Sequence, residues 1–146
     1  MVLLGAAGAV AAHAQTGRVI QRIELRAAST KPGGGVDQIT ITSAGEISLL
    51  SASGRRATGK APAGTATALW QLMKNEGFDN WDKEYKSDTS DYVGKVLTVD
   101  FIGGDRTEIV LNRSEFPEFA HVVGAIKFLL ALAMPEMATN RFFERL

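Results

Sequence analysis

The stretch LTVDFIGGDRTEIVL, at residues 97–111, carries the clearest structural signal in the chain. Apolar and polar residues alternate from Leu97 to Phe101, Gly103 and Gly104 interrupt the pattern, and the alternation resumes up to Leu111. Alternation with a period of two on both sides of a glycine-rich turn is typical of a β-hairpin with one buried face. The stretch therefore predicts an antiparallel sheet that is covered on one side.

Similar patterns occur nearer the N-terminus. Residues Arg18–Ala27 alternate as a strand, and Asp37–Ser43 pairs with Glu46–Ser51 as a second hairpin around Ser43-Ala44-Gly45. The glycine-rich segments 29–35 and 53–64 are interpreted as loops, because glycine and proline interrupt regular structure.

Two helices are expected from apolar residues at helical spacing. Residues Thr65–Glu76 place Ala66, Leu69, Trp70 and Met73 on one face, which predicts that Trp70 belongs to the core. A longer helix starts near Pro117 and ends before Pro135. Its second half is apolar nearly all round, and residues Met137–Leu146 are expected to form a further short helix.

The order strand, hairpin, helix, hairpin, helix predicts one α+β domain. We expect residues 15–146 to form it, with an antiparallel sheet of about five strands and two helices packed on one face.

The first fourteen residues, MVLLGAAGAVAAHA, resemble a secretory signal peptide that is cleaved after Ala14. They lack the usual basic start, so a buried N-terminal helix or an ordinary chain end is the alternative. The run is shorter than the roughly 20 residues that span a bilayer. Lys127 interrupts the last helix, so no transmembrane span is expected. This interpretation predicts a periplasmic or secreted protein.

Composition restricts the chemistry. The chain has no cysteine, which excludes disulfides, thiolate nucleophiles and cysteine-based zinc sites. Residues 18–60 hold seven basic and three acidic residues, a balance of +4, whereas residues 61–146 hold nine and thirteen, a balance of −4. Neither half contains the dense basic patch that nucleic-acid binding requires, so no nucleic-acid partner is expected.

Catalytic and metal-binding residues are not indicated, and no cofactor is expected. His121 is the one histidine after residue 14 and would suit acid–base chemistry, but no nucleophile motif accompanies it, so a surface or structural histidine is the alternative. The acidic segment Asp79–Asp91 could bind calcium or supply the carboxylates of a hydrolase. The alternative for this segment is a solvated loop, because its spacing matches no calcium-loop pattern.

Candidate binding residues fall in two places. Trp81 and Tyr85, with Asp88 and Asp91, lie in an irregular polar segment, where aromatic side chains either anchor a partner or pack as a lid over the sheet edge. Arg22 and Arg26 lie on one strand face with Glu24 between them, which suits either an anionic partner or a solvated surface.

The motifs Phe78-Asp79-Asn80-Trp81, Tyr85 and Asp88-Thr89-Ser90-Asp91, followed by a hairpin and Pro117, resemble an uncharacterised family of bacterial exported domains. The resemblance covers about residues 18–132 and implies two hairpin–helix units with an aromatic segment between them. That family often carries a cysteine pair in the loop that corresponds to residues 31–35, and this chain has none there. The resemblance implies no catalytic residues.

Together these features predict an exported, non-enzymatic binding module with a protein or cell-envelope partner. Apolar residues at the C-terminal end exceed what one helix face needs. They pack either on each other or on a partner, and a homodimer through the last helix is one such arrangement. These residues are Phe128, Leu132, Phe142 and Phe143.

N-terminal sequencing of the protein recovered outside the cytoplasm tests the export prediction. We expect a chain that begins at Gln15, because the small-residue triplet before it suits signal peptidase. A protein that still begins at Met1 would contradict the signal-peptide interpretation.

Overall fold

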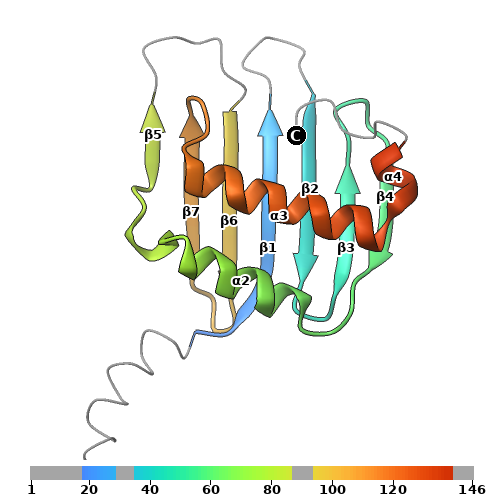
Figure 1. The fold of residues 1–146 in the computed structure, drawn as a ribbon, viewed down its shortest axis with the longest axis horizontal. Helices are drawn as coiled ribbons and strands as arrows, with labels where there is room; N and C mark the ends of the chain where they lie inside the picture. Colours follow the sequence, from blue (N-terminus) through green and yellow to red (C-terminus); the bar gives the residue numbers. More distant parts are fainter. Residues whose placement is uncertain (1–17, 29–34, 87–93, 140–146) are drawn as a thin grey trace, which may run out of the picture.

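In the computed structural model, which describes residues 18–28, 35–86 and 94–139, the hairpin of residues 97–111 lies within a seven-stranded sheet (Figure 1). Its strands are β1 (Ile20–Ala28), β2 (Val36–Thr42), β3 (Glu46–Leu50), β4 (Arg56–Lys60), β5 (Glu84–Lys86), β6 (Gly94–Phe101) and β7 (Arg106–Asn112). The helices are α2 (Thr65–Asn75), the short 3-10 helix η1 (Phe78–Asn80), α3 (Pro117–Ala133) and α4 (Pro135–Thr139).

The strands are arranged in the order β4-β3-β2-β1-β6-β7-β5. Strand β1 pairs antiparallel with both β2 and β6, so that Ile23 lies opposite Ile41 on one side and Val99 on the other. Of the strands in the described residues, only β5 runs parallel to its neighbour, β7. This register places the apolar residues of adjacent strands on the same face of the sheet.

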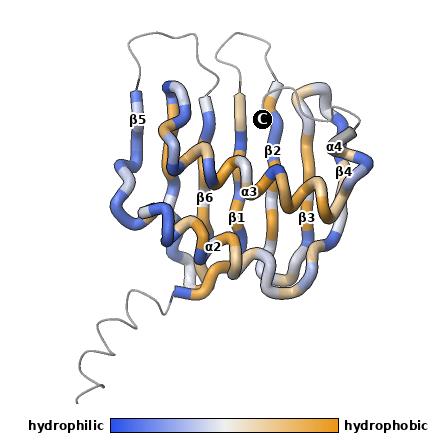
Figure 2. Tube along the Cα trace, in the orientation of Figure 1, coloured by the Kyte–Doolittle hydropathy of each residue, from blue (hydrophilic) through white to orange (hydrophobic). Residues whose placement is uncertain are grey.

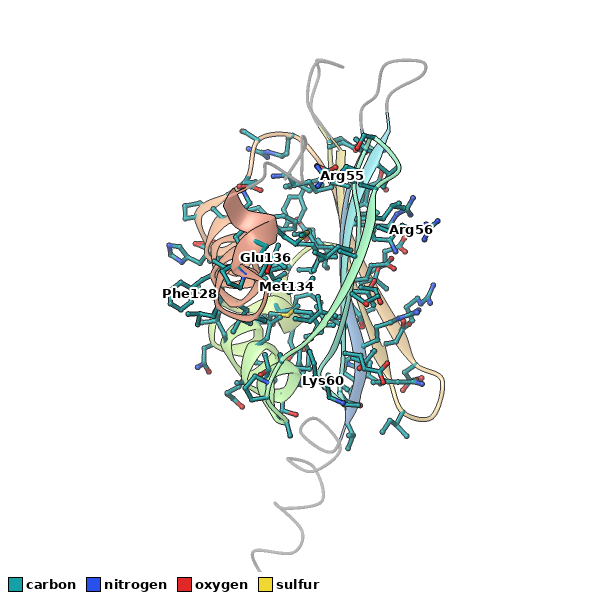
Figure 3. The ribbon with its side chains drawn as sticks, turned by 90° about the vertical axis from the view of Figure 1, so that its right-hand side faces the viewer. Arg55, Arg56, Lys60, Phe128, Met134 and Glu136 are labelled. Atoms are coloured by element: carbon teal, nitrogen blue, oxygen red, sulfur yellow. The ribbon has the colours of Figure 1, made fainter. Side chains whose placement is uncertain are left out.

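Helices α2 and α3 cover that apolar face (Figure 1), and among the described residues no helix lies on the opposite face, which we call the open face (Figure 3). The core lies between the two layers, where apolar residues of the central strands meet the helices (Figure 2). Leu97, Val99 and Ile109 of the sheet are completely buried, as are Met73 of α2 and Phe119 of α3. Each such side chain contributes about 1.5–3 kcal/mol through its removal from water.

Glycines shape the turn between β6 and β7. Gly103 and Gly104 have φ angles of +104° and +99°, which other residues rarely adopt. The N–H of Phe101 donates to Asp105 O at 2.8 Å and closes the hairpin. The predicted hairpin of residues 97–111 is therefore present with the predicted turn.

The prediction of an α+β domain is confirmed, and the expected sheet is partly matched: its five antiparallel strands correspond to β1, β2, β3, β6 and β7, and two further strands extend it. The sheet has seven strands and is mixed. Strand β4 lies in the segment 53–64, for which the sequence predicts a loop. The alternation of polar and apolar residues is weak there, because Ala57 and Gly59 are small residues on the buried side of an edge strand. Strand β5 has only three residues and depends on pairing with β7, a contact that no local pattern reveals.

The two predicted helices correspond to α2 and α3, and α4 is an additional short helix that begins at Pro135. The remainder of the helix expected at Met137–Leu146 lies beyond Thr139, outside the described residues. Within the residues that the structure describes, none of the helices is long and apolar enough to cross a membrane.

Candidate functional site

Arg22 is part of a three-residue charge cluster on the open face of the sheet. Its Nε and Nη2 donate to Asp100 Oδ2 at 3.0 and 2.7 Å, and Arg106 Nε donates to Asp100 Oδ1 at 2.5 Å. Strands β1, β6 and β7 lie side by side and hold these residues together. Hydrogen bonds from Arg106 lower the pKa of Asp100 below its ordinary value of 3.8, partly opposed by desolvation.

A hollow of about 560 Å³ lies beside this cluster, between the β2–β3 and β6–β7 turns. Arg22, Arg106 and Asp100 line it together with Glu46 and Asp105. The two guanidinium groups are already bound to Asp100, and the other two carboxylates add negative charge. An anionic ligand would therefore have to displace an internal partner, which makes this hollow a poor anion site.

Arg26 lies on the same face of β1 as Arg22 and is exposed. Its cross-strand neighbours are Gln38 and Val96, and Glu24 lies between the two arginines along the strand. Thr40 Oγ1 lies 3.5 Å from Glu24 Oε1. Arg22 and Arg26 therefore belong to a mixed polar surface in which positive charge is interrupted by carboxylates.

Trp81 is buried in an aromatic cluster rather than presented on a loop. Its ring centroid lies 5.0 Å from that of Phe116 and 5.4 Å from that of Phe78, and its Nε1 donates to Glu76 O at 3.1 Å. Tyr85 is half-buried against Phe116, with ring centroids 4.8 Å apart. These contacts suit the lid alternative, because both rings join the end of the sheet to the start of α3.

Asp88 and Asp91 lie outside the described residues, so the structure places only part of the acidic segment. Asp79, Asp82 and Glu84 are exposed. Among residues 18–28, 35–86 and 94–139, no three His, Asp or Glu side chains gather in a way that could hold a metal ion.

His121 joins the two main helices. Its Nδ1 lies 3.0 Å from Glu76 Oε1, and its side chain is 63% exposed. The contact ties α3 to the end of α2 and leaves most of the imidazole in water, where it reaches no described nucleophile.

The outer side of α3 is unusually apolar. Phe128 and Leu132 are 64% and 65% exposed. Figure 3 shows Phe128 at the surface of the helix layer, pointing away from the sheet. Exposed apolar side chains that lie together, unlike scattered ones, are typical of an interaction surface.

A shallow groove between α2 and α3 continues this surface. Its volume is about 260 Å³, and its lining is almost entirely apolar. The lining residues are Thr65, Ala68, Leu69, Leu72, Ala125, Phe128 and Leu129. We call the groove together with Phe128 and Leu132 the outer helix surface.

Gly124 lies on the same row of α3 as Phe128 and Leu132, because the three residues are four positions apart. A Cβ built on Gly124 would meet no described atom within 4 Å, so packing among the described residues does not require a glycine there. A glycine inside a helix costs about 0.5–1 kcal/mol relative to alanine. It leaves a depression next to Phe128 that a partner side chain could fill.

The sequence pattern indicated Phe128 and Leu132 as surplus apolar residues, but not the part of the groove that α2 provides. Buried Asp37 was also missed. Its Oδ1 accepts the N–H of Ala52 at 2.7 Å and so fixes the turn that leads into β4. No local sequence pattern indicates this role of Asp37, because the hydrogen bond joins residues fifteen positions apart.

A comparison with known protein families found no family model that matches this chain, and a search of curated proteins found no match. The resemblance to an uncharacterised exported family therefore stays a prediction.

Replacement of Asp100 by Asn tests the charge cluster. Because the pKa of Asp100 is lowered by folding, its ionised form stabilises the protein above about pH 4, and this stabilisation is lost as the pH falls through the lowered pKa. We expect Asp100→Asn to lower the free energy of unfolding at pH 7 by about 1 kcal/mol, since both arginines face water. Urea titrations at pH 7 and pH 2.5 measure the difference between the two proteins. An equal difference at both pH values would contradict this role.

Proposed function

We propose that this protein is an exported, non-enzymatic binding module that associates through its outer helix surface. The observation that carries the proposal is the exposure of Phe128 and Leu132 beside the apolar groove between α2 and α3. Burying apolar surface is the main favourable term in protein association, and aromatic anchors beside a groove contribute most of it. Export rests on the signal-like residues 1–14.

A second copy of the chain is the partner that suits this surface best. If two α3 helices pack antiparallel around a two-fold axis at Phe128, residues equally distant from Phe128 lie opposite each other. Leu132 and Gly124 are both four residues from Phe128, about 6 Å along the helix axis. Leu132 of each copy then fills the depression at Gly124 of the other. A leucine side chain therefore packs against a glycine at both ends of the contact.

The expected gain is moderate. Each dimer removes two Phe128 and two Leu132 side chains from water, and each is worth about 1–2 kcal/mol at its present exposure. The grooves beside them add further apolar contact. The loss of translational and rotational entropy of the two copies offsets part of this free energy, so the dimer should dissociate on dilution.

Phe128→Glu tests the proposal on the chain that starts at Gln15. We expect the dimer dissociation constant to rise about a hundredfold, because two aromatic side chains leave the contact and two carboxylates meet at its centre. Sedimentation equilibrium over a range of protein concentrations measures this constant. The fold should be retained, since Phe128 is largely exposed in the single copy.

Ile102→Glu is the matched control. Ile102 is 62% exposed but lies in the β6–β7 turn, away from the outer helix surface, so its substitution should leave the dissociation constant unchanged. A wild-type chain that is monomeric at every concentration would contradict the second copy as partner. Equal weakening by Ile102→Glu and Phe128→Glu would contradict the assignment of the surface.

A further inference from the structure

Among the described residues, strand β4 is the outermost strand at one edge of the sheet. Antiparallel neighbours alternate between residues that exchange hydrogen bonds and residues that do not. Ser51 N donates to Arg55 O at 2.9 Å, and Ala61 N donates to Gly45 O at 2.7 Å, so odd-numbered residues of β4 bond to β3. It follows that Arg56, Thr58 and Lys60 direct their backbone N–H and C=O groups away from the sheet.

The two sides of this edge differ in chemistry. Arg56, Thr58 and Lys60 are exposed and lie on the open face of the sheet, whereas Ala57 and Gly59 face the helices. Met134 packs directly on Gly59, with its Sδ only 2.6 Å from where a Cβ would be. Figure 3 shows Arg56 and Met134 on opposite sides of the sheet.

A hollow of about 230 Å³ lies on the helix side of the same edge. Gly59 and Thr58 form one wall, and the junction of α3 and α4, with Met134, Met137 and the carboxylate of Glu136, forms the other. Methionine side chains adapt to irregular apolar partners, so this hollow can accept apolar side chains of different shapes. A strand added to β4 would direct alternate side chains toward this hollow and toward Arg56 and Lys60.

We propose that the β4 edge binds an extended segment of another protein in which acidic and apolar residues alternate. Main-chain hydrogen bonds to Arg56, Thr58 and Lys60 supply the pairing, and the side chains supply selectivity. Carboxylates of the added strand lie opposite Arg56 and Lys60. Apolar residues between them lie opposite Ala57 and Gly59 and enter the hollow beside Met134.

Charge favours this partner over a second copy. Antiparallel self-pairing centred on Thr58 would place Arg56 of one copy opposite Lys60 of the other, and like charges directly opposite each other destabilise a sheet. Within the sheet, Lys60 already lies opposite Glu46, whereas Arg56 lies opposite Leu50. Arg56 is therefore the position at which a carboxylate on the added strand gains most.

A peptide with the core Glu-Val-Thr-Val-Glu is the direct probe, and the same peptide with Lys in place of Glu is its control. Titration followed by amide NMR shifts should move the signals of Arg56, Thr58 and Lys60. The acidic peptide should bind at least about tenfold more tightly than the basic one. Equal binding of both peptides, or shifts confined to α2 and α3, would overturn the proposal.

Two variants separate charge from backbone pairing. Arg56→Glu combined with Lys60→Glu should reverse the preference between the peptides, whereas Arg26→Glu, in the middle of the open face, should not change it. Thr58→Pro removes an N–H that points away from β3, so the fold should tolerate it while the affinity for the acidic peptide falls about tenfold. Unchanged binding by Thr58→Pro would overturn strand addition.

Other occupants give distinct outcomes. A basic edge that only prevents unwanted pairing would bind neither peptide. If the chain's own residues 140–146 occupy the edge, a chain that ends at Thr139 should bind the acidic peptide at least about tenfold more tightly than the full chain. Either result would contradict the proposal. The edge is remote from Phe128, so Phe128→Glu should leave peptide binding unchanged even if the dimer fails.

Discussion

The whole structure depends on the burial of one face of the sheet under α2 and α3. Buried residues from β1, β6 and β7 form one core with buried residues of both helices, and the antiparallel register of β1 with its two neighbours brings the strand residues to the same face. The described residues 18–28, 35–86 and 94–139 form two layers, and none of them covers the second face of either layer. The open face of the sheet is polar and carries paired charges such as Arg22, Arg106 and Asp100, which suits contact with water. The second face of the helices carries the exposed apolar side chains of Phe128 and Leu132, which interact poorly with water.

Much of this arrangement could be predicted from the sequence, because it depends on local patterns. The alternation on either side of Gly103 and Gly104 identified β6 and β7, and the spacing of Ala66, Leu69, Trp70 and Met73 identified α2. Strands β4 and β5 were not predictable in this way. Gly59 occupies β4 because Met134 packs against it, and β5 forms because it meets β7 in parallel, so both depend on residues distant in the sequence.

The candidate sites show the same division. The surplus of apolar residues on α3 was visible in the sequence as a departure from a simple amphipathic pattern. The structure adds the part of the groove that α2 contributes. Trp81 is the instructive contrast. The irregular polar segment left open whether its ring anchors a partner or packs as a lid. Phe78, Phe116 and Phe119 surround it, and two of these residues come from the start of α3 or just before it. Charge pairing in the sheet was equally hidden, because Arg22 and Asp100 are 78 positions apart.

The contact between Leu132 and Gly124 of two copies is the most specific consequence of the uncovered helix layer. An isotope-filtered NOE experiment on a sample in which half of the chains carry isotopic labels detects contacts between copies alone. We expect cross-peaks between the Leu132 methyl groups of one copy and the Gly124 Hα atoms of the other at high protein concentration. Between-copy cross-peaks that involve other surfaces, or none at a concentration where Phe128 and Leu132 should be buried, would contradict the two-fold helix contact.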